Sequence, residues 1–99
     1  MENDKKNHLE TLIEKSVLSD DDKKFWSTMI SRSPADFMET IYEALSIFPD
    51  ELGWFNDIFK RKQAAFALFE TDKEKGMEVL RVIYREEKQK LDELNYKQS

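Results

Sequence analysis

The chain has 99 residues, of which 39% are hydrophobic and 37% are charged, and its formal net charge is −5. It contains no cysteine, which excludes a disulfide framework, a thiolate nucleophile and a cysteine-based zinc site. Two glycines and two prolines are too few for the turns of a multi-stranded sheet. The composition therefore predicts an all-α protein, and the length predicts a single domain over residues 1–99.

No stretch of the sequence has the pattern of a membrane span or a signal peptide. The N-terminus is polar, and the longest apolar run, from Ala64 to Phe69, is far shorter than the ~20 residues that a spanning helix requires. The acidic net charge disfavours contact with nucleic acid or anionic lipid, because both present phosphate groups. We therefore expect a cytoplasmic protein that binds neither nucleic acid nor membrane.

The first two helices are predicted from apolar spacing and from one helix-start signal. Residues 1–4 are expected to be disordered, and a helix is expected over about residues 5–17. Its apolar stripe consists of Leu9, Leu12, Ile13 and Val17. Ser19 followed by three aspartates then predicts a capped helix start, with Asp22 at the third helical position. These aspartates are adjacent rather than alternate, which is not the spacing of a calcium-binding loop.

A third helix is predicted to begin beside one proline and to end at another. Ser33 is expected to cap it, with Pro34 at the first helical position. Pro49 should stop it, because the residue before a proline avoids the helical conformation. Its apolar face consists of Phe37, Met38, Ile41, Tyr42, Leu45 and Phe48.

The stretch from Trp54 to Phe69 predicts a core helix around which the other helices pack. At about 100° per residue, its apolar and mostly aromatic side chains share one face. They are Trp54, Phe55, Ile58, Phe59, Ala65, Phe66 and Phe69. Lys62 projects near the centre of this face, and we expect its stem to lie along the rings while its ammonium reaches solvent.

The last helix is predicted to be long and to change character along its length. Thr71 begins a capping pattern, and the helix should run from Asp72 to about Asn95. Apolar residues surround most of its first half, but few follow Arg85. We therefore expect about five helices in a compact bundle, with residues 86–99 forming an exposed, partly projecting helix end.

That helix end carries the first candidate interaction residues. Tyr84, Leu91 and Leu94 are spaced by seven and three, as in a coiled-coil seam, and Glu87 interrupts them. Two antiparallel copies would bury both seams, so a homodimer is one option and a frayed monomer is the other.

Catalytic chemistry has little support in the sequence. His8 is the only histidine, and it lies in a polar segment where a positioned general base is not expected. Two isolated glycines do not make a phosphate-binding loop. The sequence therefore predicts no enzyme, no cofactor and no metal. Arg81, Arg85 and Lys88 share a face of the last helix, and we expect them to form ion pairs with neighbouring acidic side chains.

The remaining functional signal is the pair of tryptophans, Trp26 and Trp54. Tryptophan is enriched among interface anchors, although in a chain this short it is more often part of the core. The function that the sequence favours is a small non-catalytic interaction or regulatory module that binds an unidentified protein through a helical surface. The alternative is a small-molecule or peptide binder with an aromatic pocket around the helix at 54–69.

Overall fold

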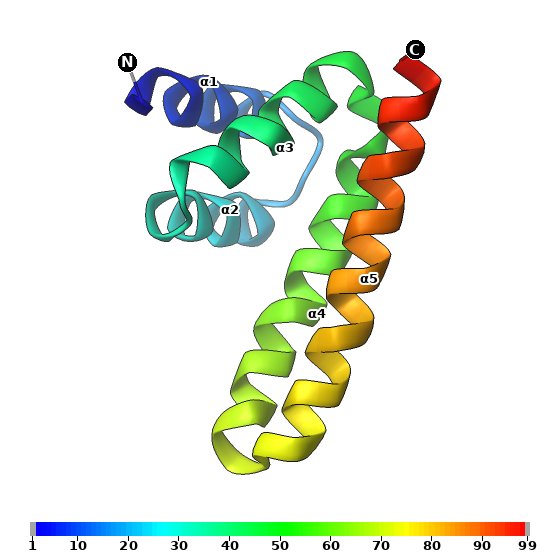
Figure 1. Ribbon diagram of the computed structural model, residues 1–99. Coiled ribbons are helices and arrows are strands. Elements are labelled where there is room, and N and C mark those ends of the chain that lie inside the picture. Colours follow the sequence, from blue (N-terminus) through cyan, green and yellow to red (C-terminus); the bar gives the residue numbers. More distant parts are fainter. Residues whose placement is uncertain (1, 99) are drawn as a thin grey trace. The chain divides into compact units, whose positions relative to one another are not determined.

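The computed structural model describes the backbone of residues 2–98 and the side chains of residues 6–97. All regular elements in this range are helical, as the composition predicts (Figure 1). They are α1 (Glu2–Glu14), α2 (Asp20–Arg32), α3 (Ala35–Ile47), the 3₁₀ helix η1 (Pro49–Glu51), α4 (Leu52–Thr71) and α5 (Lys73–Gln98). The last helix is the longest, with 26 residues, which confirms the expected five α-helices with a long final one.

Contacts within the chain divide it into two compact units, one ending at Pro49 and one beginning at Asp50. In the first unit α1 packs against both α2 and α3, and in the second α4 packs against α5. Within the first unit, the helix on which α2 and α3 pack is therefore α1. The apolar residues of the first unit that are buried are Leu9, Ile13, Trp26, Ile30, Met38, Ile41 and Leu45.

The limits of α1 differ from the prediction at both ends. The helix already begins at Glu2, where a disordered segment was expected, and Met1 lies outside the described residues. It ends at Glu14, and the Ser16 hydroxyl donates a hydrogen bond to the Ile13 carbonyl at 2.6 Å. Val17 consequently falls in the connection to α2, where its side chain is 100% exposed instead of buried.

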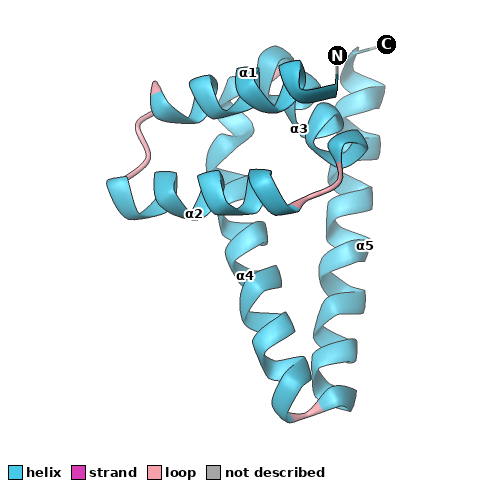
Figure 2. Cartoon of the chain, turned by 90° about the vertical axis from the view of Figure 1, so that its left-hand side faces the viewer, coloured by secondary structure: helices cyan, strands magenta, loops and turns pink. Residues whose placement is uncertain are grey.

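Serine side chains mark both ends of α2. The backbone N–H of Asp22 donates to Ser19 Oγ at 3.2 Å, which confirms the predicted cap. Ser33 does not cap α3, because its hydroxyl donates to the Met29 carbonyl at 2.8 Å and so belongs to the end of α2. Pro34 takes the cap position of α3 without a side-chain hydrogen bond. In Figure 2 the loops that flank α2 are short, and α1 and α2 run in opposite directions.

A single residue, Asp72, connects α4 to α5 and makes them a helical hairpin. Its backbone N–H donates to the Leu68 carbonyl at 2.7 Å and closes α4. Its side-chain Oδ1 accepts from Lys75 N–H at 3.2 Å, and its carbonyl accepts from Gly76 N–H at 2.9 Å, which opens α5. Asp72 therefore caps both helices, whereas the sequence suggested Thr71 for the second start.

Gly76 allows the two helices to meet immediately after this turn. A Cβ atom at this position would lie 2.3 Å from the Cα atom of Phe69 and 2.5 Å from its backbone nitrogen. The contact is with backbone atoms, so a flexible side chain cannot move away to make room. Gly53, near the start of α4, has no such neighbour, since a Cβ atom added there would meet nothing within 4 Å.

We predict that Gly76→Ala separates the helices at the turn and lowers the free energy of unfolding by roughly 1–3 kcal/mol, the usual cost of overpacking. Urea denaturation of the full chain measures this change. Gly53→Ala is the matched control: it places the same methyl group in open space and favours the helix, so stability should stay constant or rise slightly. An equally stable Gly76→Ala variant would contradict the close approach.

Candidate functional site

An ion pair between Lys62 of α4 and Glu87 of α5 lies inside the hairpin. Lys62 Nζ donates to Glu87 Oε2 at 2.7 Å, and the two side chains are only 16% and 8% exposed. The same ammonium lies 5.2 Å from the ring centres of both Phe59 and Tyr84. We expected Lys62 to reach solvent along the rings. Instead, its ammonium binds a specific carboxylate beside the two rings.

A second cross-helix ion pair holds the other end of the hairpin. Lys90 Nζ lies 3.2 Å from Glu51 Oε2 and 5.0 Å from the ring centre of Trp54. Beyond Glu86, where an exposed helix end was expected, α5 is thus joined to α4 through Glu87 and to η1 through Lys90. Helix α5 remains packed there because α4 is 20 residues long and already begins at Leu52.

A third ion pair, between Arg61 and Glu86, is solvent-exposed. Arg61 Nη1 and Nη2 donate to the two Glu86 carboxylate oxygens at 3.2 and 2.7 Å. These hydrogen bonds lower the pKa of Glu86 below its ordinary value and raise that of Arg61. A carboxyl group whose pKa is lowered by folding stabilises the folded chain at pH values above the pKa that the same group has in the unfolded chain. That contribution disappears as the pH falls through the lowered value.

Three large apolar side chains of the hairpin remain exposed on one face: Phe66 at 48%, Met77 at 38% and Tyr84 at 48%. Met77 and Tyr84 are seven residues apart, so they lie on the same flank of α5. The contact of Tyr84 with Lys62 places this flank beside the side of α4 that carries Lys62. Phe66 follows Lys62 by one helical turn, and we call Phe66, Met77 and Tyr84 the hairpin patch.

The alignment of the two helices places Phe66 between its two neighbours in the hairpin patch. Phe69 lies against Gly76 near the turn, and Lys62 lies against Glu87 further along. In an antiparallel pair, a residue of α4 between Lys62 and Phe69 lies level with residues of α5 between Gly76 and Glu87. Phe66 is therefore level with the middle of the segment that Met77 and Tyr84 delimit. The three side chains form one surface and not three isolated exposures.

The opposite flank of α5 carries two exposed valines that can be compared with the hairpin patch. Val79 and Val82 are 38% and 46% exposed, which is close to the exposure of Met77 and Tyr84. Val79 follows Met77 by two residues, and Val82 precedes Tyr84 by two residues. Two residues correspond to about 200° around a helix, so the two valines lie on the side of α5 away from the hairpin patch.

The predicted site residues fall into three groups. Trp26, Glu87 and Leu94 are buried, with exposed fractions of 0%, 6% and 3%. Trp54 and Leu91 are half-buried. Only Tyr84 is well exposed, so the expected seam of Tyr84, Leu91 and Leu94 cannot be presented to a partner as a unit.

Sequence reasoning missed Phe66 and Met77 as surface residues. The sequence predicts Phe66 on the buried aromatic face, which the structure contradicts, and Met77 in a two-sided apolar segment. No signal in the sequence separates Phe66 from its buried neighbour Ala65, because both lie on the same apolar face. The carboxylate opposite Lys62 could not be identified without knowing how the two helices align.

The aromatic pocket expected around the helix at 54–69 has little open aromatic surface. Phe55 and Phe59 are 0% and 2% exposed, and the ring of Trp54 lies under Lys90. The ring of Phe55 also packs edge-on against that of Trp54, with 5.1 Å between ring centres. These rings therefore stabilise the fold.

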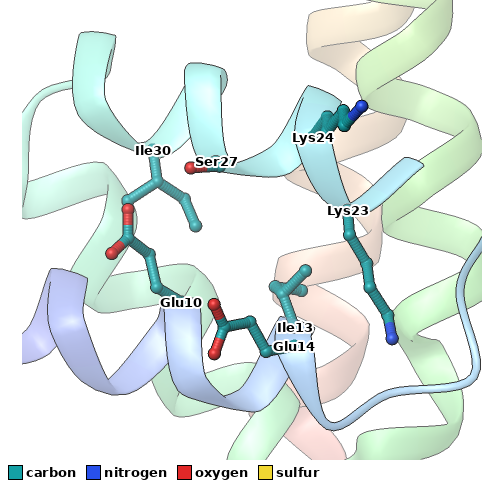
Figure 3. Close-up of a pocket in the computed structure, with 7 residues that line it drawn as sticks. All are labelled: Glu10, Ile13, Glu14, Lys23, Lys24, Ser27 and Ile30. Carbon is teal, nitrogen blue, oxygen red and sulfur yellow. The ribbon is translucent and has the colours of Figure 1, made fainter. Parts of the chain in front are cut away.

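A small cavity of ≈ 260 Å³ lies between α1 and α2 of the first unit (Figure 3). Buried Ile13 and Ile30 form its apolar part. The carboxylates of Glu10 and Glu14 point into the space between the helices, while Lys24 extends away from it. Its remaining lining residues are Lys23 and Ser27. Glutamates and lysines both lie at the open rim of the cavity, where solvent screens their charges. They therefore give the cavity little selectivity for a charged ligand.

Two other features, a membrane-spanning helix and a metal site, were sought among the described residues. Among residues 2–98, no helix has both the length and the apolarity needed to cross a membrane. No group of three or more histidine, aspartate or glutamate side chains in the described range could hold a metal ion. His8 is exposed and lies beside Tyr42, with 5.7 Å between ring centres.

Comparison with known proteins gives no relative: no protein-family model, no curated protein and no solved structure matches the chain.

We predict that Lys62→Met lowers the free energy of unfolding by roughly 3–5 kcal/mol, because it leaves the Glu87 carboxylate buried without a cation. The double variant Lys62→Met with Glu87→Met should regain most of that loss, since an apolar pair of similar volume avoids the burial of charge. Chemical denaturation of both variants checks the prediction. Lys88→Met, which removes the exposed pair with Asp92, should have a far smaller effect. A stable Lys62→Met single variant would show that the ion pair is dispensable.

We predict that Arg61→Gln raises the pKa of Glu86 towards its ordinary value, because the hydrogen bonds that favour the carboxylate are removed. Carbon-detected NMR titration of the carboxyl groups measures this shift directly. Lys88→Gln is the control, since Lys88 pairs with Asp92 and should leave the Glu86 titration unchanged. Identical Glu86 titrations in the Arg61→Gln variant and the parent chain would contradict the assignment.

Proposed function

We propose that this chain is a non-catalytic interaction module that binds a helix of a partner protein through the hairpin patch. The observation that carries the proposal is the joint exposure of Phe66, Met77 and Tyr84 on one face of the hairpin. Large apolar side chains scattered singly are ordinary on protein surfaces, whereas a contiguous group indicates an interaction site. Tyrosine, in addition, is enriched among residues that dominate binding energy.

The scaffold beneath the hairpin patch supports this proposal. Asp72 caps both helices, Gly76 brings them into contact, and the Lys62–Glu87 ion pair lies directly under Tyr84. A surface held on two packed helices loses little conformational freedom when a partner binds. Exposed apolar side chains on neighbouring helices are also a surface against which the apolar face of an amphipathic helix can pack.

A displayed library of helical peptides, with apolar residues spaced four and three apart, tests the proposal on the full chain. We expect selected peptides to lose at least ~10-fold in affinity for the Phe66→Ser, Tyr84→Ser double variant, as removal of interface anchors typically does. The Val79→Ser, Val82→Ser variant removes equally exposed apolar groups from the opposite flank and should bind as the parent does.

Circular dichroism of both double variants establishes that each remains folded. Sedimentation equilibrium of the parent chain, measured alongside, tests the homodimer that the sequence leaves open. Peptides that bind the Phe66, Tyr84 variant as tightly as the parent would show that the hairpin patch is not the binding surface.

A further inference from the structure

A single stripe of α5 that runs through the hairpin patch alternates cations with apolar residues. Successive members are separated by four, four, three and four residues, so all lie on the same flank of the helix. In chain order they are Lys73, Met77, Arg81, Tyr84 and Lys88. The acidic residues Glu74 and Asp92 lie near the two ends of this flank, whereas the charged residue between Met77 and Tyr84 on it is Arg81.

The cations of this stripe are available to a partner. Arg81 forms no ion pair with any residue that the structure describes, in contrast to the pairing that the sequence suggested. Lys88 is paired with Asp92 at 3.1 Å, but both side chains are strongly exposed, at 80% and 68%. Such surface pairs contribute little and are readily exchanged. Lys73 lies with its ammonium 5.9 Å from the ring centre of Phe69.

We infer that the partner of the hairpin patch is an acidic amphipathic helix whose carboxylates alternate with its apolar residues. The inference rests on the proposed function and names the chemistry of its ligand. Apolar side chains of the partner would cover Phe66, Met77 and Tyr84, and a carboxylate between them would meet the Arg81 guanidinium, which can bind it through two hydrogen bonds.

The same stripe disfavours a second copy of the chain as the occupant. In a two-fold symmetric, antiparallel contact centred on Arg81, that residue would face its own counterpart and Lys73 would face Lys88. Like charges brought together in this way oppose association. Nucleic acid is disfavoured as well, because the cations alternate with apolar side chains that a phosphate backbone would leave without a partner.

The test is a peptide library in which the apolar positions are fixed and the positions between them are drawn from Glu, Gln and Lys. We expect Glu to be enriched among binders of the full chain, and an all-Glu peptide to bind at least ~10-fold more tightly than its all-Gln counterpart. Raising the salt concentration should narrow this difference, because exposed charges are screened.

Arg81→Gln should reduce the affinity of the all-Glu peptide and leave that of the all-Gln peptide unchanged. Lys75→Gln is the matched control, since Lys75 is an exposed cation of α5 that lies two residues from Met77 and off the stripe. Equal enrichment of Glu, Gln and Lys would overturn the acidic partner and leave the interaction module standing. Absence of any binder that depends on the hairpin patch would overturn both the acidic partner and the interaction module. An oligonucleotide that displaces the peptide from the parent chain, but not from the Arg81→Gln variant, would assign the stripe to nucleic acid instead.

Discussion

The ion pair between Lys62 and Glu87 is the interaction on which the hairpin depends. Two helices that meet only through apolar side chains have several rotations and offsets of similar stability, because apolar contacts are not directional. A lysine with 16% of its side chain exposed restricts them, since an alignment that separates it from its carboxylate leaves a buried charge unpaired. The alignment in which the two groups meet is also the one that turns Phe66, a helical turn later, towards solvent.

Two further contacts act at the ends of the same pair of helices. Near the turn, Gly76 permits backbone contact with Phe69, so the helices begin at their closest approach. At the far end, Lys90 binds Glu51 and covers the ring of Trp54. The Lys62–Glu87 pair lies between these points, and together the three contacts define both the offset and the rotation of α5 on α4. The hairpin patch is therefore a consequence of the packing beneath it.

Features of the fold that depend on neighbours in the sequence could be predicted, and those that depend on pairing between helices could not. The Ser19 cap and the helix end before Pro49 follow from local backbone chemistry, and both are found in the structure. Helical periodicity correctly places Phe55 and Ile58 in the interior. Periodicity does not reveal how wide the covered face of α4 is. For this reason it wrongly includes Phe66, although Ala65 is buried and Phe69 packs against Gly76.

The same limit explains why the sequence places the buried residues Glu87 and Leu94 on an exposed seam. The sequence gives no partner for Glu87, because Lys62, the cation that pairs with it, lies 25 residues away and only the hairpin brings the two together. Glu87 is therefore predicted to interrupt an exposed seam. Leu94 falls on that seam because the sequence gives few apolar residues after Arg85. The structure buries both residues, and of that predicted seam it leaves only Tyr84 well exposed.

The alternation of cations and apolar residues along α5 reconciles two demands on an exposed apolar surface. A continuous apolar stripe would bind its own copies and other apolar surfaces without discrimination. A cation at every second position makes self-contact repulsive and lowers the affinity for apolar surfaces in general, because a guanidinium or ammonium would have to be desolvated without a partner. Only a partner that supplies carboxylates at the matching positions avoids this cost. The cations that would oppose association between two copies of the chain would thus be the same ones that select its ligand.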